Sequence, residues 1–317
     1  MVAAPVEFSQ MGLNPALFKK SSENSYRGPC PKCGGTRRFL VFTDQPWPHY
    51  LGICDECGLK AWADQLNPAL KGNGIPDPLE MKMREGVTQK HIAQQALERK
   101  TALDQFRTRA DVPALHLGMS DENQEWWCSQ GISRQWQGFW ELGYIPNRTF
   151  SSNGSAYSSP CYTIPKFDLG WELTNMDYRL VNPPEKTGKY RQEYGLASAA
   201  FISRPDYDKL YVNGVTYVVE GSKKAMVTCI QGGGEIQVIG LPGCASWGGI
   251  PERLAKGAER VYVIFDPDAE EWGQRFAAQV GKHARALTLP VKIDDAFISG
   301  GLTWTIFQKL LLQARKG

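Results

Sequence analysis

Two matched cysteine pairs place the strongest constraint on what this chain can fold into. Cys30 and Cys33 form one Cys-x-x-Cys pair, Cys54 and Cys57 form a second, and twenty residues separate the pairs. This spacing is typical of a zinc ribbon, in which four thiolates bind one tetrahedral Zn²⁺. A unit of about 40 residues buries too little apolar surface to fold alone, whereas a structural zinc contributes roughly 10 to 16 kcal/mol. We therefore expect the metal to decide whether this domain folds.

The residues around the cysteines fit the same fold. The segments 38–42 and 50–53 are predicted to be paired strands, and Gly34 and Gly58 follow the two cysteine pairs, where a tight turn is expected. Disulfides or a redox pair are the alternatives, and the lack of a secretory signal favours zinc over both. The other four cysteines are expected to be small buried apolar residues: Cys128, Cys161, Cys229 and Cys244.

Composition excludes few functions. The chain has 317 residues, enough for two or three compact units, and its 42% hydrophobic and 22% charged residues are ordinary for a globular protein. No apolar run reaches the roughly 18 residues needed to cross a bilayer, and residues 1–10 lack the pattern of a secretory signal. We expect a cytoplasmic protein with no membrane partner. The net charge of +3 does not decide whether nucleic acid is a partner.

Three acidic side chains follow apolar strands in the last third of the chain. Beyond residue 206 strands are predicted over 214–219, 236–241, 260–265 and 286–290, and helices over 222–230 and from 269 to about 284. Their alternation predicts a parallel sheet. Glu220 and the pair Asp266 and Asp268 then fall at the carboxyl ends of two strands, where functional residues of such sheets lie. Three clustered carboxylates favour a bound Mg²⁺ or Mn²⁺, and such sites support phosphoryl or nucleotidyl transfer. The alternative is that these acids only cap a helix or occupy turns.

Cations precede the acidic residues in the chain. Lys186, Lys189 and Arg191, with Tyr190 between the last two, suit phosphate binding, and a solvated loop explains them equally well. Lys223 opposes the dipole of its predicted helix, so it either faces solvent or is drawn to an anion. Two interpretations also stay open for Asp294 and Asp295, which either add an outer metal contact or cap a helix. Helices are predicted over 88–109, 121–130 and 133–142, with Asp121 and Ser133 as candidate N-caps of the last two. The tryptophans near 126–140 are expected to lie in the core.

The acidic motifs carry a resemblance to a known family. Glu220-Gly221 and Asp266-Pro267-Asp268 resemble the two motifs of the TOPRIM domain. With the cysteine pairs before them, they make the chain similar to DnaG-type primases of phages or other mobile elements. Tyr178-Arg179-Leu180 and Gly188-Lys189-Tyr190 resemble the family's basic segments. Lys292 to Phe297 resembles a later acidic element of the family, but Ile293 replaces its first acid.

The resemblance implies a fold, an activity and partners. The fold would be α/β: a zinc-ribbon domain, followed by a mixed α+β primase core that contains a TOPRIM parallel sheet. The implied domains are 1–66 for the ribbon, 67–110 for a linker and connecting helix, 111–205 for the amino-terminal subdomain of the core and 206–317 for TOPRIM. The implied activity is DNA-directed RNA primase. Its partners would be a single-stranded DNA template, nucleoside triphosphates, the RNA primer product and, as a separate chain, a replicative helicase. A phage-encoded protein of this kind would act in the cytoplasm of a bacterial host cell.

The resemblance also implies roles for individual residues. Glu220 would be a metal ligand or proton acceptor, while Asp266 and Asp268 would hold catalytic Mg²⁺ or Mn²⁺. Arg179 and Lys189 would line a basin for template and nucleotides. Two other functions combine similar parts: a non-catalytic recombination mediator of the RecR type, which has a four-cysteine zinc site with TOPRIM, and a TOPRIM nuclease.

Overall fold

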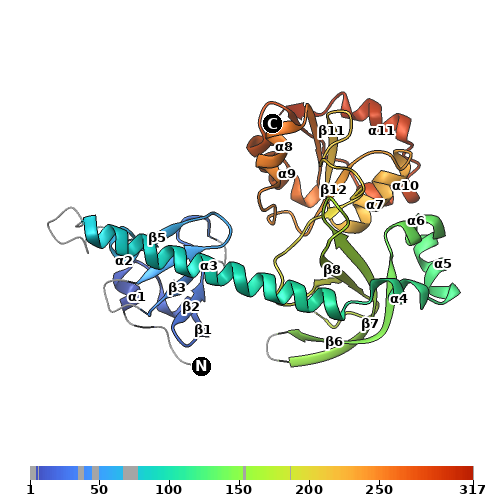
Figure 1. Ribbon diagram of the computed structural model, residues 1–317. Coiled ribbons are helices and arrows are strands. Elements are labelled where there is room, and N and C mark those ends of the chain that lie inside the picture. Colours follow the sequence, from blue (N-terminus) through green and yellow to red (C-terminus); the bar gives the residue numbers. More distant parts are fainter. Residues whose placement is uncertain are drawn as a thin grey trace. The chain divides into compact units, whose positions relative to one another are not determined.

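The computed structural model describes residue 5 and residues 7–34, 39–44, 50–66, 78–152, 155–185 and 187–316. It divides into two compact units, Met1–Ala96 and Leu97–Gly317 (Figure 1). The predicted linker up to residue 77 and Lys186 lie outside the described residues. No described helix has the length and apolar character that a membrane span requires.

The first unit is built on a five-stranded antiparallel sheet. Its strands pair in chain order: β1 (Lys19–Ser22), β2 (Ser25–Gly28), β3 (Phe39–Phe42), β4 (Leu51–Cys54) and β5 (Lys60–Trp62). Three short helical segments flank the sheet: α1 (Glu7–Gln10), η1 (Pro15–Leu17) and α2 (Ala63–Leu66). Phe39 pairs with Cys54 in the register of β3 and β4, which confirms the predicted strand pairing between the two cysteine pairs.

A long polar helix, α3 (Pro78–Arg109), runs through the boundary between the units and begins ten residues before the helix predicted over 88–109. Of its described side chains only Phe106 is buried, and it packs in a core of the second unit. Three short helices follow: α4 (Val112–Leu117), α5 (Asp121–Ser129) and α6 (Arg134–Phe139). The last two confirm helices expected from the sequence, although Ser120 and not Asp121 caps α5.

The second unit contains two sheets. The first is antiparallel, with its four strands in chain order: β6 (Gly143–Ser152), β7 (Ser155–Phe167), β8 (Leu173–Leu180) and β9 (Tyr190–Gln192). The second has six strands in the order β10 (Phe201–Ile202), β12 (Val238–Leu241), β11 (Val215–Glu220), β13 (Arg260–Ile264), β14 (Ala284–Ala286) and β15 (Arg315–Lys316). The four inner strands are parallel, as predicted, and the two edge strands are antiparallel.

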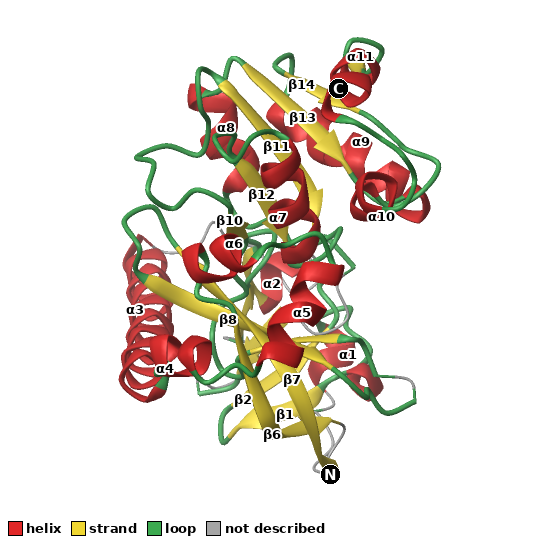
Figure 2. Ribbon diagram, turned by 90° about the vertical axis from the view of Figure 1, so that its right-hand side faces the viewer, coloured by secondary structure: helices red, strands yellow, loops and turns green. Residues whose placement is uncertain are grey.

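Helices cover both faces of the six-stranded sheet (Figure 2). On one face lie α7 (Ser222–Gln231), α10 (Ile293–Ile298) and α11 (Trp304–Leu311), and on the other α8 (Ile250–Gly257) and α9 (Glu270–Val280). The central strand β11 illustrates why both faces need a covering of helices: its apolar side chains alternate between the two faces. Tyr217 and Val219 join the core beneath α7, whereas Val218 joins the core beneath α8 and α9. Both faces are therefore buried, as expected for a parallel sheet.

One hydrophobic core joins the two sheets of the second unit. Tyr162 and Ile164 of β7 pack in the same core as Met226 of α7. Trp127 and Trp140 are fully buried there, which confirms that the tryptophan-rich segment belongs to the core. The shared core fixes β7, and through its pairing with β7 also β8, against α7, which begins directly after Gly221.

A few boundaries differ from those expected. The helix predicted to extend to about residue 284 ends at Val280, because Gly281 adopts a positive φ of 88°. The strand expected over 286–290 lies at Ala284–Ala286. Of the four scattered cysteines, Cys161 and Cys229 are fully buried as predicted, whereas Cys128 and Cys244 are partly exposed.

Candidate functional site

The four cysteines of the first unit converge on one point. Their sulfur atoms all lie within 4.8 Å of one another, with 3.7 Å between Cys30 and Cys57 and 3.7 Å between Cys33 and Cys54. Sulfurs at the corners of a tetrahedron around zinc, each about 2.3 Å from the metal, lie about 3.8 Å apart. The donor set and its spacing thus fit a tetrahedral zinc, and all four residues are free thiols.

Tight turns hold these thiols in place. Gly34 and Gly58 both adopt positive φ, 72° and 66°, a conformation that strains any residue with a side chain. The backbone N–H of Gly34 donates to the carbonyl of Cys30, and that of Cys54 donates to the carbonyl of Leu59. The N–H of Lys32 points at the sulfur of Cys30, 3.4 Å away. The turns expected from the sequence are therefore present.

A cavity of about 410 Å³ lies in the second unit, where the two sheets meet. It collects residues from both sheets and from the helices next to them. Six of the residues predicted to form the site line it: Arg179, Lys189, Tyr190, Glu220, Lys223 and Asp266. The other lining residues are Gly221, Ser222, Lys224, Pro242, Lys292, Asp294 and Asp295. Asp268 and Arg191 do not line it.

The acidic side of the cavity is partly neutralised by lysines. Asp266 follows β13 and is 7% exposed. Its Oδ2 lies 2.8 Å from Nζ of Lys224 and 3.6 Å from Nζ of Lys292. The charge of Asp266 in turn raises the pKa of Lys292. Lys292 was not predicted to be a site residue. Its position directly before Ile293-Asp294-Asp295, an acidic helix start, is the sequence feature that could have indicated it.

Glu220 is held in an anionic environment at the end of β11. Burial raises the pKa of this carboxyl, Lys224 lowers it, and the charges of Asp266 and Asp268 raise it further. Asp268 lies in the short segment η3 (Pro267–Ala269) and is exposed, yet it is close enough to act on Glu220. The three acids therefore interact electrostatically, as their positions at adjacent strand ends predicted.

Hard cations prefer oxygen ligands of this kind. Within the described residues only the four thiols form a group of three or more ligands as close as 4.8 Å. The three carboxylates form no group as close as that, and Asp266 attracts Lys224 and Lys292, which shows that the negative charge at this edge needs compensation. The chemistry of Glu220, Asp266 and Asp268 fits a divalent cation.

The basic side of the cavity comes from the antiparallel sheet. Arg179 of β8 pairs with Tyr190 of β9 in the strand register, and both line the cavity. The guanidinium of Arg179 lies over the ring of Trp126, 4.3 Å from its centroid, and Trp126 itself stacks on Tyr162. Such cation–π stacking fixes the direction of the arginine side chain. Arg191 instead donates to the hydroxyl of Tyr157.

Asp294 forms an ion pair with Lys223 at the wall of the cavity. Its Oδ2 lies 2.8 Å from Nζ of Lys223, which also donates to Gln130. The other oxygen, Oδ1, is buried and has no hydrogen-bond partner. Lys292 occupies the cap position of α10, so neither Asp294 nor Asp295 is the cap. Lys223 is therefore drawn to an anion, one of the two alternatives left open by the sequence.

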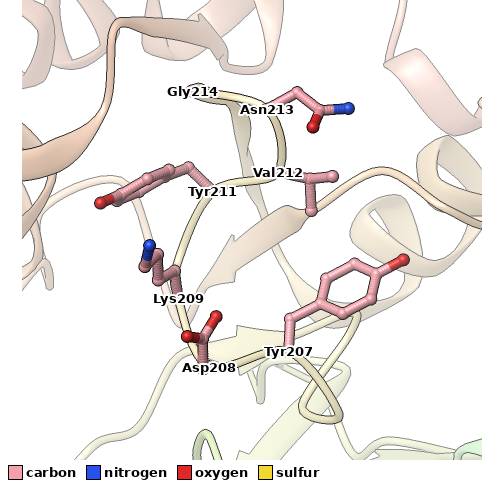
Figure 3. A pocket seen from close by; sticks show the side chains of 7 residues that line it. All are labelled: Tyr207, Asp208, Lys209, Tyr211, Val212, Asn213 and Gly214. Carbon is pink, nitrogen blue, oxygen red and sulfur yellow. The ribbon is translucent and has the colours of Figure 1, made fainter.

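A second cavity of about 390 Å³ lies at the opposite end of β11 (Figure 3). A single loop, residues 207–214, provides all of its lining. Its charged side chains are Asp208 and Lys209, and Asn213 and Gly214 form its turn with positive φ. The amino ends of parallel strands are not where functional residues of such sheets gather. The first cavity is therefore the candidate site.

No protein-family model and no curated protein matches the chain. The chain does match solved structures. One is the primase of Aquifex aeolicus, zinc-binding and RNA polymerase domains, with a TM-score of 0.51 at 15% identity over 98% of this chain and 82% of that one. A DnaG primase catalytic domain bound to single-stranded DNA gives 0.54 at 13% identity over 71% and 83%. A DnaG catalytic core gives 0.52 at 13% identity over 67% and 79%. This chain has the fold of the zinc-binding and RNA polymerase domains of DnaG primases.

Proposed function

We propose that this chain is a DNA-directed RNA primase, which synthesises short primers on single-stranded DNA by metal-dependent nucleotidyl transfer. One observation carries the proposal. In a fold shared with DnaG primases, one cavity brings Arg179 of β8 and Lys189, directly before β9, together with Glu220 and Asp266 at the carboxyl ends of parallel strands. Cations next to a carboxylate cluster suit a reaction between anionic phosphates.

The protein groups have distinct roles in this reaction. Arg179, Lys189 and Tyr190 bind the triphosphate and the template backbone, with Arg191 extending this surface beyond the cavity. The primer 3′ hydroxyl attacks the α-phosphorus of the incoming nucleotide, and pyrophosphate leaves. Glu220, with its raised pKa, is suited to accept the proton of that hydroxyl. Lys223 helps to balance the charge of Asp294.

Mg²⁺ or Mn²⁺ would be held by Glu220, Asp266 and Asp268, and would neutralise charge that develops on the reacting phosphate. The buried Oδ1 of Asp294, which has no hydrogen-bond partner, is available to an outer ligand on the same side. Lys224 and Lys292 compete with the cation for Asp266, so we expect them to turn toward phosphate oxygens when nucleotide enters.

We assign the segment 206–317 to a TOPRIM domain. Support comes from the four parallel strands, from Glu220-Gly221 at the end of β11 and from the Asp-x-Asp motif directly after β13. Residues 111–205 then form the amino-terminal subdomain of the core, and residues 67–110 connect it to the ribbon. In the ribbon, Zn²⁺ bound by the four cysteines is structural, and the ribbon contributes to template reading.

Incubation of the protein with single-stranded DNA, labelled ribonucleoside triphosphates and Mg²⁺ or Mn²⁺ tests the proposal. We expect short RNA products that depend on the template and the metal, and none on fully duplex DNA. Cleavage of the DNA without incorporation would identify a nuclease instead. DNA binding without either reaction, and unchanged when Glu220, Asp266 and Asp268 are neutralised, would identify a non-catalytic mediator. Either outcome rejects the primase proposal.

A further inference from the structure

A buried ion pair lies directly behind the candidate site. The side chain of Lys166 on β7 is 0% exposed, and that of Asp177 on β8 is 8% exposed. Nζ of Lys166 lies 2.8 Å from Oδ1 of Asp177 and donates to the carbonyl of Ala199. Burial lowers the pKa of Lys166, and Asp177 counteracts this shift. Because a buried charge without a partner is costly, each member of the pair depends on the other.

The second oxygen of Asp177 reaches the other sheet. Oδ2 accepts a hydrogen bond from Oγ of Ser222 at 2.5 Å. Ser222 is the first residue of α7, and it follows Glu220-Gly221 directly. The cap residue of α7 is Gly221, which has no side chain to cap the helix. A carboxylate at this end also interacts favourably with the helix dipole. Asp177, on the antiparallel sheet, therefore holds the first residue of α7 through its hydroxyl and places a negative charge at this end of the helix.

The same carboxylate anchors the basic side of the cavity. Asp177 and Arg179 are two residues apart on β8, so they lie on the same face of the strand. Oδ1 of Asp177 also accepts from Nε2 of Gln192, at the end of β9, two residues after Tyr190. Arg179 and Tyr190 both line the cavity. One buried carboxylate thus contacts elements that carry the cationic and the acidic sides of the site.

We propose that Asp177, held by Lys166, is a positioning residue that fixes Glu220 relative to Arg179 and Tyr190 through Ser222. The inference rests on the proposed function, because it assigns Asp177 a part in that reaction without contact to the reacting atoms. Reactions of this kind are sensitive to position, and a shift of about 1 Å can cost as much as 100-fold in rate. The fold itself has other supports, since the two sheets share a hydrophobic core.

Ser222→Ala breaks this contact while leaving the ion pair in place. Thr228→Val is the matched control, because Thr228 lies on the same helix, is buried, and its hydroxyl has no hydrogen-bond partner. In steady-state primer synthesis, well below the melting temperature of both variants, we expect Ser222→Ala to lower kcat about tenfold. Its KM for nucleotide should stay within about twofold, since Arg179 is untouched. Thr228→Val should match the wild type.

Hydrogen exchange gives a second readout, independent of activity. In Ser222→Ala the amides of residues 225–228, which form the first hydrogen bonds of α7, should exchange faster than in the wild type and in Thr228→Val, while those of β11 stay protected. A merely stabilising role of Ser222 would instead lower the melting temperature without a change in kcat at lower temperature.

Two double variants distinguish the effect of the hydrogen bond between Ser222 and Asp177 from the effect of the buried charges of Lys166 and Asp177. Lys166→Met with Asp177→Asn removes both charges and keeps an oxygen that can accept from Ser222, so kcat should stay within about threefold of the wild type. Lys166→Met with Asp177→Leu removes the acceptor as well, and kcat should fall like that of Ser222→Ala.

The outcomes distinguish the inference from the proposed function. If the wild type makes primers and Ser222→Ala makes them with an unchanged kcat, the positioning role is wrong and the primase assignment stands. Equal kcat for the two double variants also overturns it. If the wild type makes no primers under any condition, the primase assignment fails, and the positioning role fails with it.

Discussion

The two units each gather ligand-type side chains, and they do so in opposite ways. In the first unit the sulfurs of Cys30, Cys33, Cys54 and Cys57 converge within 4.8 Å of one another. In the second, Glu220, Asp266 and Asp268 form no group as close as that, and Asp266 is paired with Lys224 and Lys292. The thiols form a closed set that fits one tetrahedral ion. The carboxylates border a cavity of about 410 Å³ that also contains cations.

We interpret the thiol cluster as a structural metal site and the carboxylate cluster as a site of reaction. Structural zinc sites are closed by protein ligands, whereas sites for reaction keep room for substrate. The hydrophobic core of the first unit includes Cys30 and Cys54 themselves, so we expect this unit to need the bound metal in order to fold. The second unit has its own hydrophobic cores, so its acidic cluster is free to serve chemistry.

Loss of the four-cysteine metal site should have the largest effect on folding. Because structural zinc contributes roughly 10 to 16 kcal/mol to folding, Cys54→Ser or a strong chelator should unfold the first unit and leave the second folded. Hydrogen exchange measures this: amides of β3 and β4 should lose protection, and those of β11 and β13 should keep it. Cys244→Ser, a partly exposed cysteine outside the cluster, is the control. Full protection of β3 and β4 in the chelated protein would show that the metal is dispensable.

The next largest loss of stability should come from breaking the buried ion pair of Lys166 and Asp177 in the second unit. Lys166→Met leaves Asp177 buried without its ion partner, and breaking such a pair costs about 3 to 5 kcal/mol. Denaturant unfolding of the second unit should show this loss. Lys209→Met, in the loop of the other cavity, should change stability by less than about 0.5 kcal/mol. An unchanged stability in Lys166→Met would mean that this pair does not support the fold.

Arg179 should affect binding and leave the fold intact. Hydrogen bonds to charged groups contribute about 1.5 to 3 kcal/mol, so Arg179→Ala should raise the KM for nucleotide at least about tenfold. Arg260→Ala, an exposed arginine at the opposite end of β13, should leave KM unchanged. Arg191→Ala tests how far the basic side extends, because Arg191 lies next to Tyr190 but does not line the cavity. Equal KM values for Arg179→Ala and the wild type would remove the basic side from the site.

The smallest effect should be a shift in the pH dependence of primer synthesis when Lys224 loses its charge. Glu220 must be ionised to accept a proton, and Lys224 lowers its pKa. Lys224→Met removes that positive charge, so the pKa of Glu220 should rise further and the acidic limb of the activity profile should move to higher pH. Lys256→Met on α8 should leave the limb in place. A shift to lower pH in Lys224→Met would contradict the assigned interaction.

The sequence predicted the parts of the site that rest on local patterns. Apolar runs that end in Glu220 and Asp266 marked parallel strands, and the glycine after each cysteine pair marked a turn. It could not predict contacts between distant segments. Asp177 and Ser222 are 45 residues apart and meet only because two sheets share a core. The end of α9 was misplaced for a local reason, the positive φ of Gly281.

The central claim is that the carboxylates serve chemistry and not folding, and Asp266→Asn tests it most directly. Metal neutralisation of reacting phosphates is worth several kcal/mol, and each 1.4 kcal/mol is tenfold in rate. Primer synthesis by Asp266→Asn on single-stranded DNA should therefore fall at least about 100-fold, with its melting temperature within a few degrees of the wild type and of Asp208→Asn. Full synthesis by Asp266→Asn would contradict the account.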